Sequence, residues 1–152
     1  MPGYPRVGRL FLCLVTLVAA CASQAEAPAE TWTDRMGVEV RTVEKGEGEA
    51  GELQVVLAPK EGWSINTAYP GVKVELAESV PAEKRVLKKD DGAFEGEKPG
   101  DKADRLVLST RLSGPAPAKV EGSYKAVICT KASCSPPFTG TFSLAPAGAK
   151  AE

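Results

Sequence analysis

Hydrophobic residues recur at every second position in much of this chain, and this alternation constrains the fold more than any other feature of the sequence. It is clearest at residues 72–76, 105–112 and 138–144. The first of these segments, VKVEL, alternates apolar and charged residues, and the last, FTGTFSL, alternates Phe, Gly and Leu with Thr and Ser. A period of two is typical of antiparallel strands with one buried face and one solvated face. We therefore predict half-buried strands in all three segments.

Further strands are predicted between clusters of turn-forming residues. The additional candidate strands are residues 37–43, 53–58, 85–87 and 120–129. The triplets KEG, DDG and KPG, at residues 60–62, 90–92 and 98–100, supply turn chemistry between them. About seven short strands with frequent turns predict an all-β fold, an antiparallel β-sandwich that is immunoglobulin-like in the broad sense. After the amino-terminal segment, no stretch has the pattern of a long helix.

Residues 1–20 have the composition of an export signal. Arg6 and Arg9 supply a basic start, residues 10–17 are almost entirely apolar, and Ala19-Ala20 precede a cleavage position. The apolar run is about 11 residues long, whereas a membrane-spanning helix needs about 20. We therefore interpret the segment as a signal peptide that is removed after export.

The residues that follow indicate the class of signal. Val18-Ala19-Ala20-Cys21 resembles the lipobox of bacterial lipoproteins, in which the cysteine receives a diacylglycerol and becomes the first residue after cleavage. The alternative is an ordinary secretory signal, cut after Ala20 or Ala25. The cysteine count supports lipidation, because removal of Cys13 leaves three of the four cysteines, and an odd thiol in an oxidising compartment needs an explanation.

We therefore expect a lipid-anchored protein of the bacterial cell envelope that faces the periplasm. Several acyl chains would hold it to the membrane without a protein span. Ala22 stands where many bacterial lipoproteins retained at the inner membrane have an aspartate, which favours the outer membrane. Without the signal, 17 of the 19 basic side chains and all 20 acidic ones remain, a formal charge of −3. That balance gives no basic patch for nucleic acid.

Composition divides the mature chain into three parts. Residues 21–35 are rich in Ala, Glu, Ser and Pro and are predicted to be a flexible spacer, residues 36–145 the β-sandwich domain, and residues 146–152 a disordered tail. Trp63, between a turn and a strand, is a candidate core residue. Trp32 lies in the spacer and is not expected to join the core.

Two cysteines lie close together near the carboxyl terminus. If the strand at 120–129 is unbroken, its alternation places Cys129 on the outward face. Cys134 falls in the connection before the next strand, where Pro136-Pro137 prevent ladder pairing. Two thiols separated by four residues across such a bend can form a disulfide, since a bridge needs Cα atoms only about 5.5 Å apart.

The stretch YKAVICTKASCSPPFTGTFSL, with Ser-Pro-Pro directly after its second cysteine, resembles the amino-terminal periplasmic domain of the thiol:disulfide interchange protein DsbD. Residues 61–70, EGWSINTAYP, add a second, vaguer similarity. The resemblance implies an immunoglobulin-like fold in which Cys129 and Cys134 are the redox pair that exchanges with a thioredoxin-fold oxidoreductase. The spacing here, C-x4-C, is one residue shorter than this family leads us to expect. The chain lacks the transmembrane and thioredoxin-like parts of DsbD, so a relay would need a separate electron donor.

The residues alone therefore leave two functions open. In the first, the pair exchanges disulfides: a partner attacks the outward-facing sulfur of Cys129, Lys125 and Lys131 stabilise the thiolate, and Cys134 is the resolving cysteine. In the second, the protein is a non-catalytic envelope module that binds another protein or an envelope component, and the disulfide is structural. Closing a loop of about six residues removes only about 2 kcal/mol of unfolded-state entropy, so the bridge would add little to the stability of the whole domain.

Other chemistries are excluded or disfavoured. The chain has no histidine, which rules out Ser-His-Asp catalysis and histidine metal sites, and we predict neither a metal nor a cofactor. The acidic residues at positions 90–104 do not have the spacing of a calcium loop and alternate with lysines, so we interpret them as a solvated charged loop. At most, the protein is a thiol–disulfide exchange enzyme.

Overall fold

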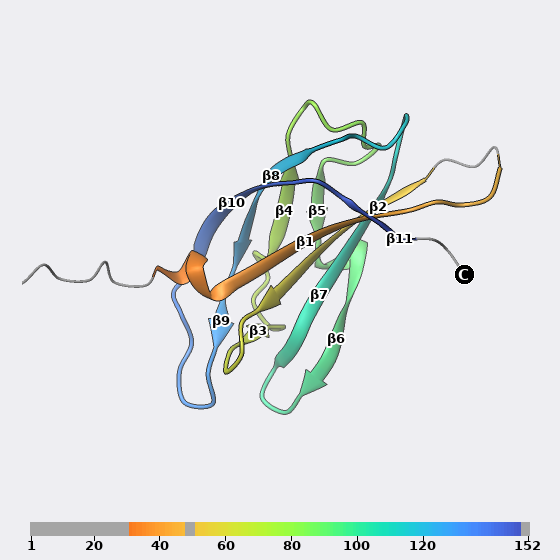
Figure 1. Cartoon of the computed structure of the whole chain (residues 1–152). Helices are drawn as coiled ribbons and strands as arrows, with labels where there is room; N and C mark the ends of the chain where they lie inside the picture. Colours follow the sequence, from red (N-terminus) through yellow and green to blue (C-terminus); the bar gives the residue numbers. More distant parts are fainter. Residues whose placement is uncertain (1–30, 48–50, 150–152) are drawn as a thin grey trace, which may run out of the picture.

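The computed structural model describes residues 31–47 and 51–149, and this part of the chain consists of two packed β-sheets. Figure 1 shows the sheets and the order of their strands. The predicted signal, Cys13, Cys21 and residues 21–30 of the predicted spacer lie outside the described residues. Within the described ranges, no helix has the length and apolar character needed to cross a membrane.

The larger sheet has seven strands, in the order β11-β1-β2-β7-β3-β9, with β6 also paired to β7. Every pair in it is antiparallel except that of β1 and β11. Its strands are β1 (Met36–Val43), β2 (Glu52–Pro59), β3 (Ser64–Asn66), β6 (Gly92–Lys98), β7 (Lys102–Arg111), β9 (Ile128–Cys129) and β11 (Ala147–Ala149).

The smaller sheet has four strands in the order β10-β8-β4-β5, all antiparallel. Its strands are β4 (Lys73–Leu76), β5 (Val86–Lys88), β8 (Val120–Ala126) and β10 (Phe138–Leu144). Val74 lies opposite Leu87 on one side and Tyr124 on the other, so all three side chains share the inner face. Two short 3-10 helices, η1 (Trp32–Arg35) and η2 (Lys89–Asp91), flank the strands.

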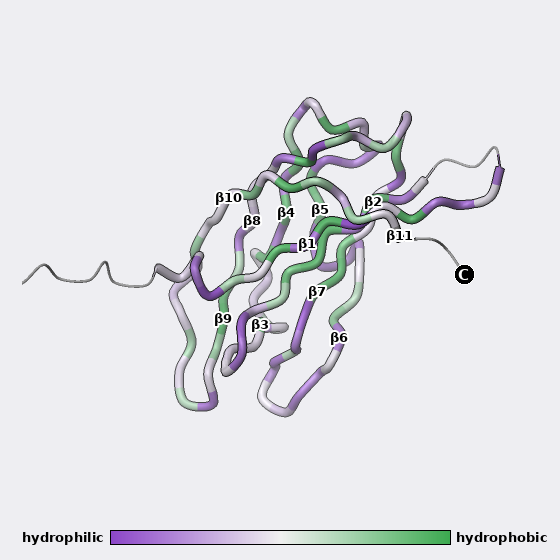
Figure 2. Tube along the Cα trace, in the orientation of Figure 1, coloured by the Kyte–Doolittle hydropathy of each residue, from purple (hydrophilic) through white to green (hydrophobic). Residues whose placement is uncertain are grey.

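The core lies between the two sheets and consists of the apolar positions of the alternating pattern. Buried side chains from both sheets form one cluster, which includes Leu53, Val55, Leu57, Ile65, Val74, Leu87, Leu106, Leu108, Val120 and Ile128. In Figure 2 the hydrophobic colour follows the strands at the centre of the molecule, and much of the β6–β7 hairpin is hydrophilic. The predicted all-β sandwich is therefore confirmed, because the period of two places one face of each long strand in this cluster.

Several predicted strand boundaries agree with the structure within a few residues. Strand β10 spans the same residues as its prediction, and β1 and β2 extend theirs by one residue at one end or at both. Strands β3, β6 and β11 were not predicted. Strand β6 lies in the segment interpreted as a charged loop, and its hairpin with β7 carries the ion pairs Lys98–Asp104 and Arg105–Glu95.

Both proposed boundaries of the domain differ from the structure. At the carboxyl end, the predicted tail contains β11, which pairs with residues 41–43 of β1. At the amino end, the predicted spacer contains η1, where the Asp34 carboxylate accepts hydrogen bonds from the backbone N–H (2.9 Å) and the hydroxyl (3.0 Å) of Thr31. Composition did not reveal either element, because each is held by a few specific contacts.

The expectation that Trp32 stays outside the core is wrong. Its ring packs edge-on against Trp63, with ring centroids 5.6 Å apart, and both rings lie against the core cluster. The Arg35 guanidinium lies 4.9 Å from the centroid of Trp32 and 4.8 Å from that of Trp63. Edge-on aromatic pairs and cation–π contacts stabilise such arrangements by roughly 0.5–1.5 kcal/mol each. Trp63 joins the core margin as predicted.

Candidate thiol–disulfide site

Cys129 and Cys134 form a disulfide at one end of the sandwich. The sulfur atoms are 2.04 Å apart and the Cα atoms 4.0 Å apart. Cys129 ends β9, and Cys134 lies in the connection from β9 to β10, which Figure 1 shows at the same end as the tip of the β6–β7 hairpin. The two cysteines also form a single antiparallel β-bridge. The cystine therefore closes a narrow hairpin on the edge of the larger sheet.

The prediction that Cys129 faces outward is wrong, because the strand at 120–129 is not continuous. Strand β8 ends at Ala126 in the smaller sheet, and after Val127 the chain enters the larger sheet as β9. In β9, Ile128 pairs with Ile65, and Cys129 pairs with Ser64. The crossing between sheets resets the alternation, so Cys129 is only 1% exposed.

The two sulfurs consequently have different surroundings. Cys134 is exposed, together with Lys131, Ala132 and Ser133 before it. Cys134 therefore lies at the surface of the molecule, whereas Cys129 is covered by its neighbours. Thiol–disulfide exchange depends on which sulfur is accessible. The sequence-based assignment of attack to Cys129 and of resolution to Cys134 is therefore reversed by the burial of Cys129.

Hydrogen bonds to the backbone fix the hairpin around the cystine. The N–H of Thr130 donates to the carbonyl of Ser133 (2.8 Å), and the hydroxyl of Thr130 accepts from the N–H groups of Ala132 (3.3 Å) and Ser133 (3.2 Å). Ser135, 6% exposed, donates its N–H to the carbonyl of Ile128 (2.8 Å), and its hydroxyl oxygen accepts from the N–H of Ile128 (3.1 Å). The prolines at 136–137 have no N–H, which ends the pairing directly afterwards.

Asn66 contacts the buried sulfur, and sequence reasoning did not single it out. Its side-chain Nδ2 donates to Sγ of Cys129 at 3.7 Å. Its Oδ1 accepts from the N–H groups of Ala68 (2.8 Å) and Tyr69 (3.1 Å). These two bonds fix which end of the amide faces the sulfur. The contact joins residues 63 positions apart, so only the pairing of β3 with β9 reveals it.

A lysine on a third segment supports the same hairpin. Lys102 lies opposite Asn66 where β3 pairs with β7, and its Nζ donates to the carbonyl of Thr130 at 2.8 Å. The N–H of Thr67 donates to the carbonyl of Asp101 at 2.9 Å. Three segments therefore meet at the cystine: residues 66–69, residues 101–102 and residues 128–135.

The lysines nominated from the sequence have different positions. Lys131 is exposed in the cystine hairpin, as its place in the loop predicted. Lys125, in contrast, lies on β8 in the smaller sheet, opposite Lys73 and Thr139. It lines a hollow of about 220 Å³ on that sheet. The change of sheet after Ala126 separates Lys125 from the strand that carries Cys129, and Lys102 is the lysine that contacts the hairpin.

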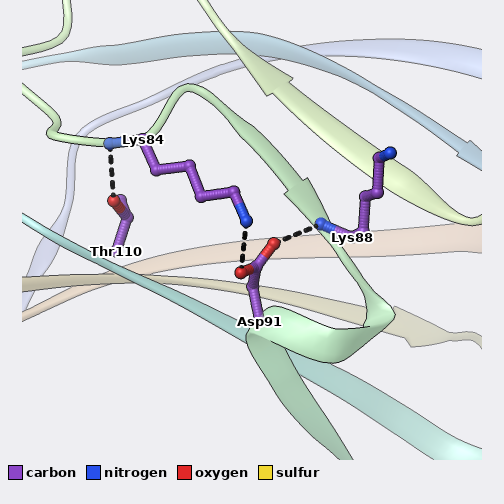
Figure 3. Close-up of polar contacts among 4 residues, drawn as sticks. All are labelled: Lys84, Lys88, Asp91 and Thr110. Atoms are coloured by element: carbon purple, nitrogen blue, oxygen red, sulfur yellow. Dashed lines mark hydrogen bonds and ion pairs between the residues drawn. The ribbon is translucent and has the colours of Figure 1, made fainter.

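A second polar cluster lies away from the three segments, at η2, and its contacts are structural. The Asp91 carboxylate accepts from Nζ of Lys84 (2.6 Å) and from the N–H of Lys88 (2.8 Å), as Figure 3 shows. The hydrogen bond from the Lys84 side chain, followed by that from the Lys88 backbone, lowers the pKa of Asp91 below its ordinary value. Lys84 also donates its backbone N–H to the hydroxyl of Thr110 (3.2 Å).

The carboxylates at 90–104 take different roles. Asp91 joins this cluster, whereas Glu95 and Asp104 form ion pairs on the β6–β7 hairpin. Among the described residues, no group of three or more His, Cys, Asp or Glu side chains is arranged to hold a metal ion.

The fold and the cystine together define the chain as an immunoglobulin-like β-sandwich with a disulfide-closed hairpin at one end. A comparison with solved structures finds similarity to the N-terminal domain of DsbD from Neisseria meningitidis, determined in its reduced form. The sequences are 10% identical, the match covers 79% of this chain and 92% of that one, and the TM-score is 0.43. No protein-family model and no curated protein sequence matches the chain.

Proposed function

We propose that this protein exchanges disulfides with a thioredoxin-fold partner and that Cys134 and Cys129 are its redox pair. The observation that carries the proposal is the asymmetry of the cystine: Cys134 is exposed, and Cys129 is 1% exposed. One sulfur is therefore open to attack, and the other is positioned to leave and to resolve. The sequence resemblance of residues 124–144 to the DsbD domain implies the same pair.

The reaction follows from this asymmetry. A partner thiolate attacks Sγ of Cys134, the Cys129–Cys134 bond breaks, and its electron pair goes to Sγ of Cys129 as a thiolate. The product is a mixed disulfide between Cys134 and the partner. A second partner thiol then attacks the partner's sulfur in that bond and releases Cys134 as a thiolate. The domain gains two electrons, the partner dithiol becomes a disulfide, and the two partner protons pass to solvent or to the released thiolates.

The position of the bridge suits reversible reduction. A disulfide that closes about six residues contributes only about 2 kcal/mol by its effect on unfolded-state entropy. The core cluster between the sheets includes neither cysteine, and the backbone hydrogen bonds around the hairpin do not involve the two sulfurs. We therefore infer that the reduced domain stays folded, which an exchange protein requires.

We also propose that the protein is anchored through acylated Cys21 in the bacterial cell envelope and faces the periplasm, with the outer membrane favoured. The support is the sequence of residues 1–22 alone. Labelled palmitate should be incorporated into the protein in a bacterial host and disappear from the Cys21→Ser variant. An unlabelled wild-type protein would contradict the anchor and leave the redox proposal standing.

The exchange itself is tested by mixing the oxidised mature chain carrying Cys21→Ser with reduced thioredoxin. We expect two thiols to appear in the domain for each thioredoxin oxidised, at a rate well above that with the same concentration of glutathione. The Cys129→Ser/Cys134→Ser variant is the control and should leave thioredoxin reduced. A cystine inert to thioredoxin would contradict the proposal.

A second function is favoured by one observation, the burial of Cys129 against β3. In this alternative, the disulfide only stiffens the hairpin, and the protein is a non-catalytic binding module of the envelope. Such a module keeps its binding activity when both cysteines are replaced by serine. The thioredoxin assay separates the two functions, because only the exchange protein reacts.

A further inference from the structure

We propose that Asn66 stabilises the Cys129 thiolate when the disulfide opens and thereby sets the reduction potential of the site. The inference rests on the proposed function for its biological meaning, but the chemical effect belongs to the cystine itself. Its basis is the hydrogen bond from Nδ2 of Asn66 to Sγ of Cys129, at 3.7 Å.

Burial makes a stabilising donor necessary. Cys129 is 1% exposed, and a thiolate released there cannot be fully solvated by water. Transfer of a charge away from water is unfavourable unless protein groups replace the lost hydration. The Nδ2–H of Asn66 already points at this sulfur in the oxidised state, so it can strengthen its bond as negative charge develops without a rearrangement.

The amide is held in the required orientation. Oδ1 of Asn66 accepts two backbone hydrogen bonds, from Ala68 and Tyr69. A rotation that exchanged Oδ1 and Nδ2 would place N–H against N–H and lose both bonds. The donor therefore faces the sulfur, and the acceptor faces the loop.

A nearby cation also favours the Cys129 thiolate. Lys102 lies opposite Asn66 in the β3–β7 pairing, and its ammonium group is fixed on the carbonyl of Thr130, the residue after Cys129. A positive charge close to the leaving sulfur favours the thiolate. Asn66 supplies the direct contact, and Lys102 adds to the field around it.

The proposal also explains the preferred direction of attack. When a partner thiolate bonds to Cys134, the electron pair of the broken bond reaches the sulfur that has the amide donor. Attack on Cys129 would instead release Cys134, which makes no such contact among the described residues. A sulfur whose thiolate is stabilised is the better leaving group. Accessibility and leaving-group stability thus select the same sulfur for attack.

The test uses the mature chain with Cys21→Ser and measures the equilibrium between the cystine and glutathione across a graded redox buffer. We expect Asn66→Ala to make reduction about tenfold less favourable, which lowers the reduction potential by about 30 mV for this two-electron couple. Asn66→Asp should have a larger effect in the same direction. It keeps an oxygen for Ala68 and Tyr69 but replaces the donor to the sulfur with a charged acceptor.

A matched control separates this effect from a looser hairpin. Thr130→Val removes a hydroxyl whose hydrogen bonds among the described residues are to Ala132 and Ser133 and not to either sulfur. We expect this variant to change the equilibrium less than threefold. In a Cys134→Ser background, the ultraviolet absorbance of the Cys129 thiolate should titrate at higher pH when Asn66 is Ala or Asp than when it is Asn.

The results distinguish this inference from the proposed function. If both Asn66 variants have the wild-type potential and thiol titration, the inference is wrong, whether or not thioredoxin is oxidised. If the potential and the titration shift as expected but thioredoxin does not react, the role of Asn66 stands and the proposed exchange function fails.

Discussion

The interior between the sheets and the cystine hairpin at the end of the sandwich are held together in different ways. The interior is a cluster of Leu, Val and Ile side chains contributed by nearly every strand. The hairpin, residues 128–135, is held by one disulfide and by hydrogen bonds, two of which come from side chains on other segments, Asn66 and Lys102. Burial of apolar surface is non-directional, whereas each of these bonds needs a particular donor and acceptor.

Stability and the proposed exchange chemistry are therefore located in separate parts of the molecule. Changes in the interior should alter the free energy of unfolding and leave the reactivity of the folded cystine unchanged. Changes at the cystine and at the side chains that contact it should alter reactivity and cost less stability.

The largest loss of stability is expected from the interior. Leu108 of β7 is fully buried in the core cluster. Leu108→Ala should lower the free energy of unfolding by about 2–5 kcal/mol through lost burial and a residual cavity. Denaturant unfolding measures the change. Val86→Ala, at a side chain 40% exposed, is the control and should change stability by less than about 0.5 kcal/mol. If folded Leu108→Ala reacted with thioredoxin more slowly than the wild-type domain does, stability and reactivity would not be separate.

Loss of the disulfide should cost less than loss of a core side chain. Cys129→Ser/Cys134→Ser should lower the free energy of unfolding by about 2 kcal/mol, because the closed loop is short. The β-sheet circular dichroism spectrum should be retained. Equilibrium unfolding of both forms measures the difference, and an unfolded variant would show that the hairpin supports the whole sandwich.

Acid should act on the flank of the sandwich rather than on the cystine, which does not titrate. The hydrogen bonds from Lys84 and then Lys88 lower the pKa of Asp91, so its contribution to stability is complete above the carboxyl's unfolded value of about 3.9. The contribution disappears as the pH falls through the lower folded pKa. Asp91→Asn should remove this part of the pH dependence, which is at most about 1 kcal/mol. Unfolding midpoints between about pH 2 and 6 test it, with the exposed neighbour Asp90→Asn as the control.

The smallest effect is expected at the tip of the β6–β7 hairpin. Lys98 and Asp104 form an ion pair of 2.5 Å, but their side chains are 51% and 56% exposed. Asp104→Asn should change the free energy of unfolding by less than about 0.5 kcal/mol, and added salt should reduce the difference further. A change as large as that of the cystine variant would contradict the ranking.

The sandwich could be predicted because the interior depends on a repeating pattern. Strand β10 is the clearest case: its alternation is unbroken, and Pro137 and Pro146 stand close to its two ends. The strands without such a pattern were missed. Strand β11 has a composition of Ala and Gly, and its existence depends on pairing with β1.

Of the site, only the two cysteines could be predicted from the sequence. The two cysteines lie close together because few residues separate them, but the exposure of each depends on the break in the strand at Val127. No Gly or Pro marks this break in the sequence. A valine in an apolar stretch fits a continuous strand equally well. The contacts of Asn66 and Lys102 join distant segments, and one sequence carries no signal for such pairs. Directional contacts across strands are therefore the part that required the structure.

Capture of a partner by each cysteine alone decides whether exchange begins at Cys134. Cys129→Ser and Cys134→Ser variants, both with Cys21→Ser, are mixed with a thioredoxin whose single active-site cysteine carries a thionitrobenzoate leaving group. We predict that Cys134, in the first variant, displaces the leaving group and forms a mixed disulfide at least tenfold faster than Cys129 does in the second. Equal rates, or faster capture by Cys129, would contradict the claim that the exposed sulfur of Cys134 is the point of exchange.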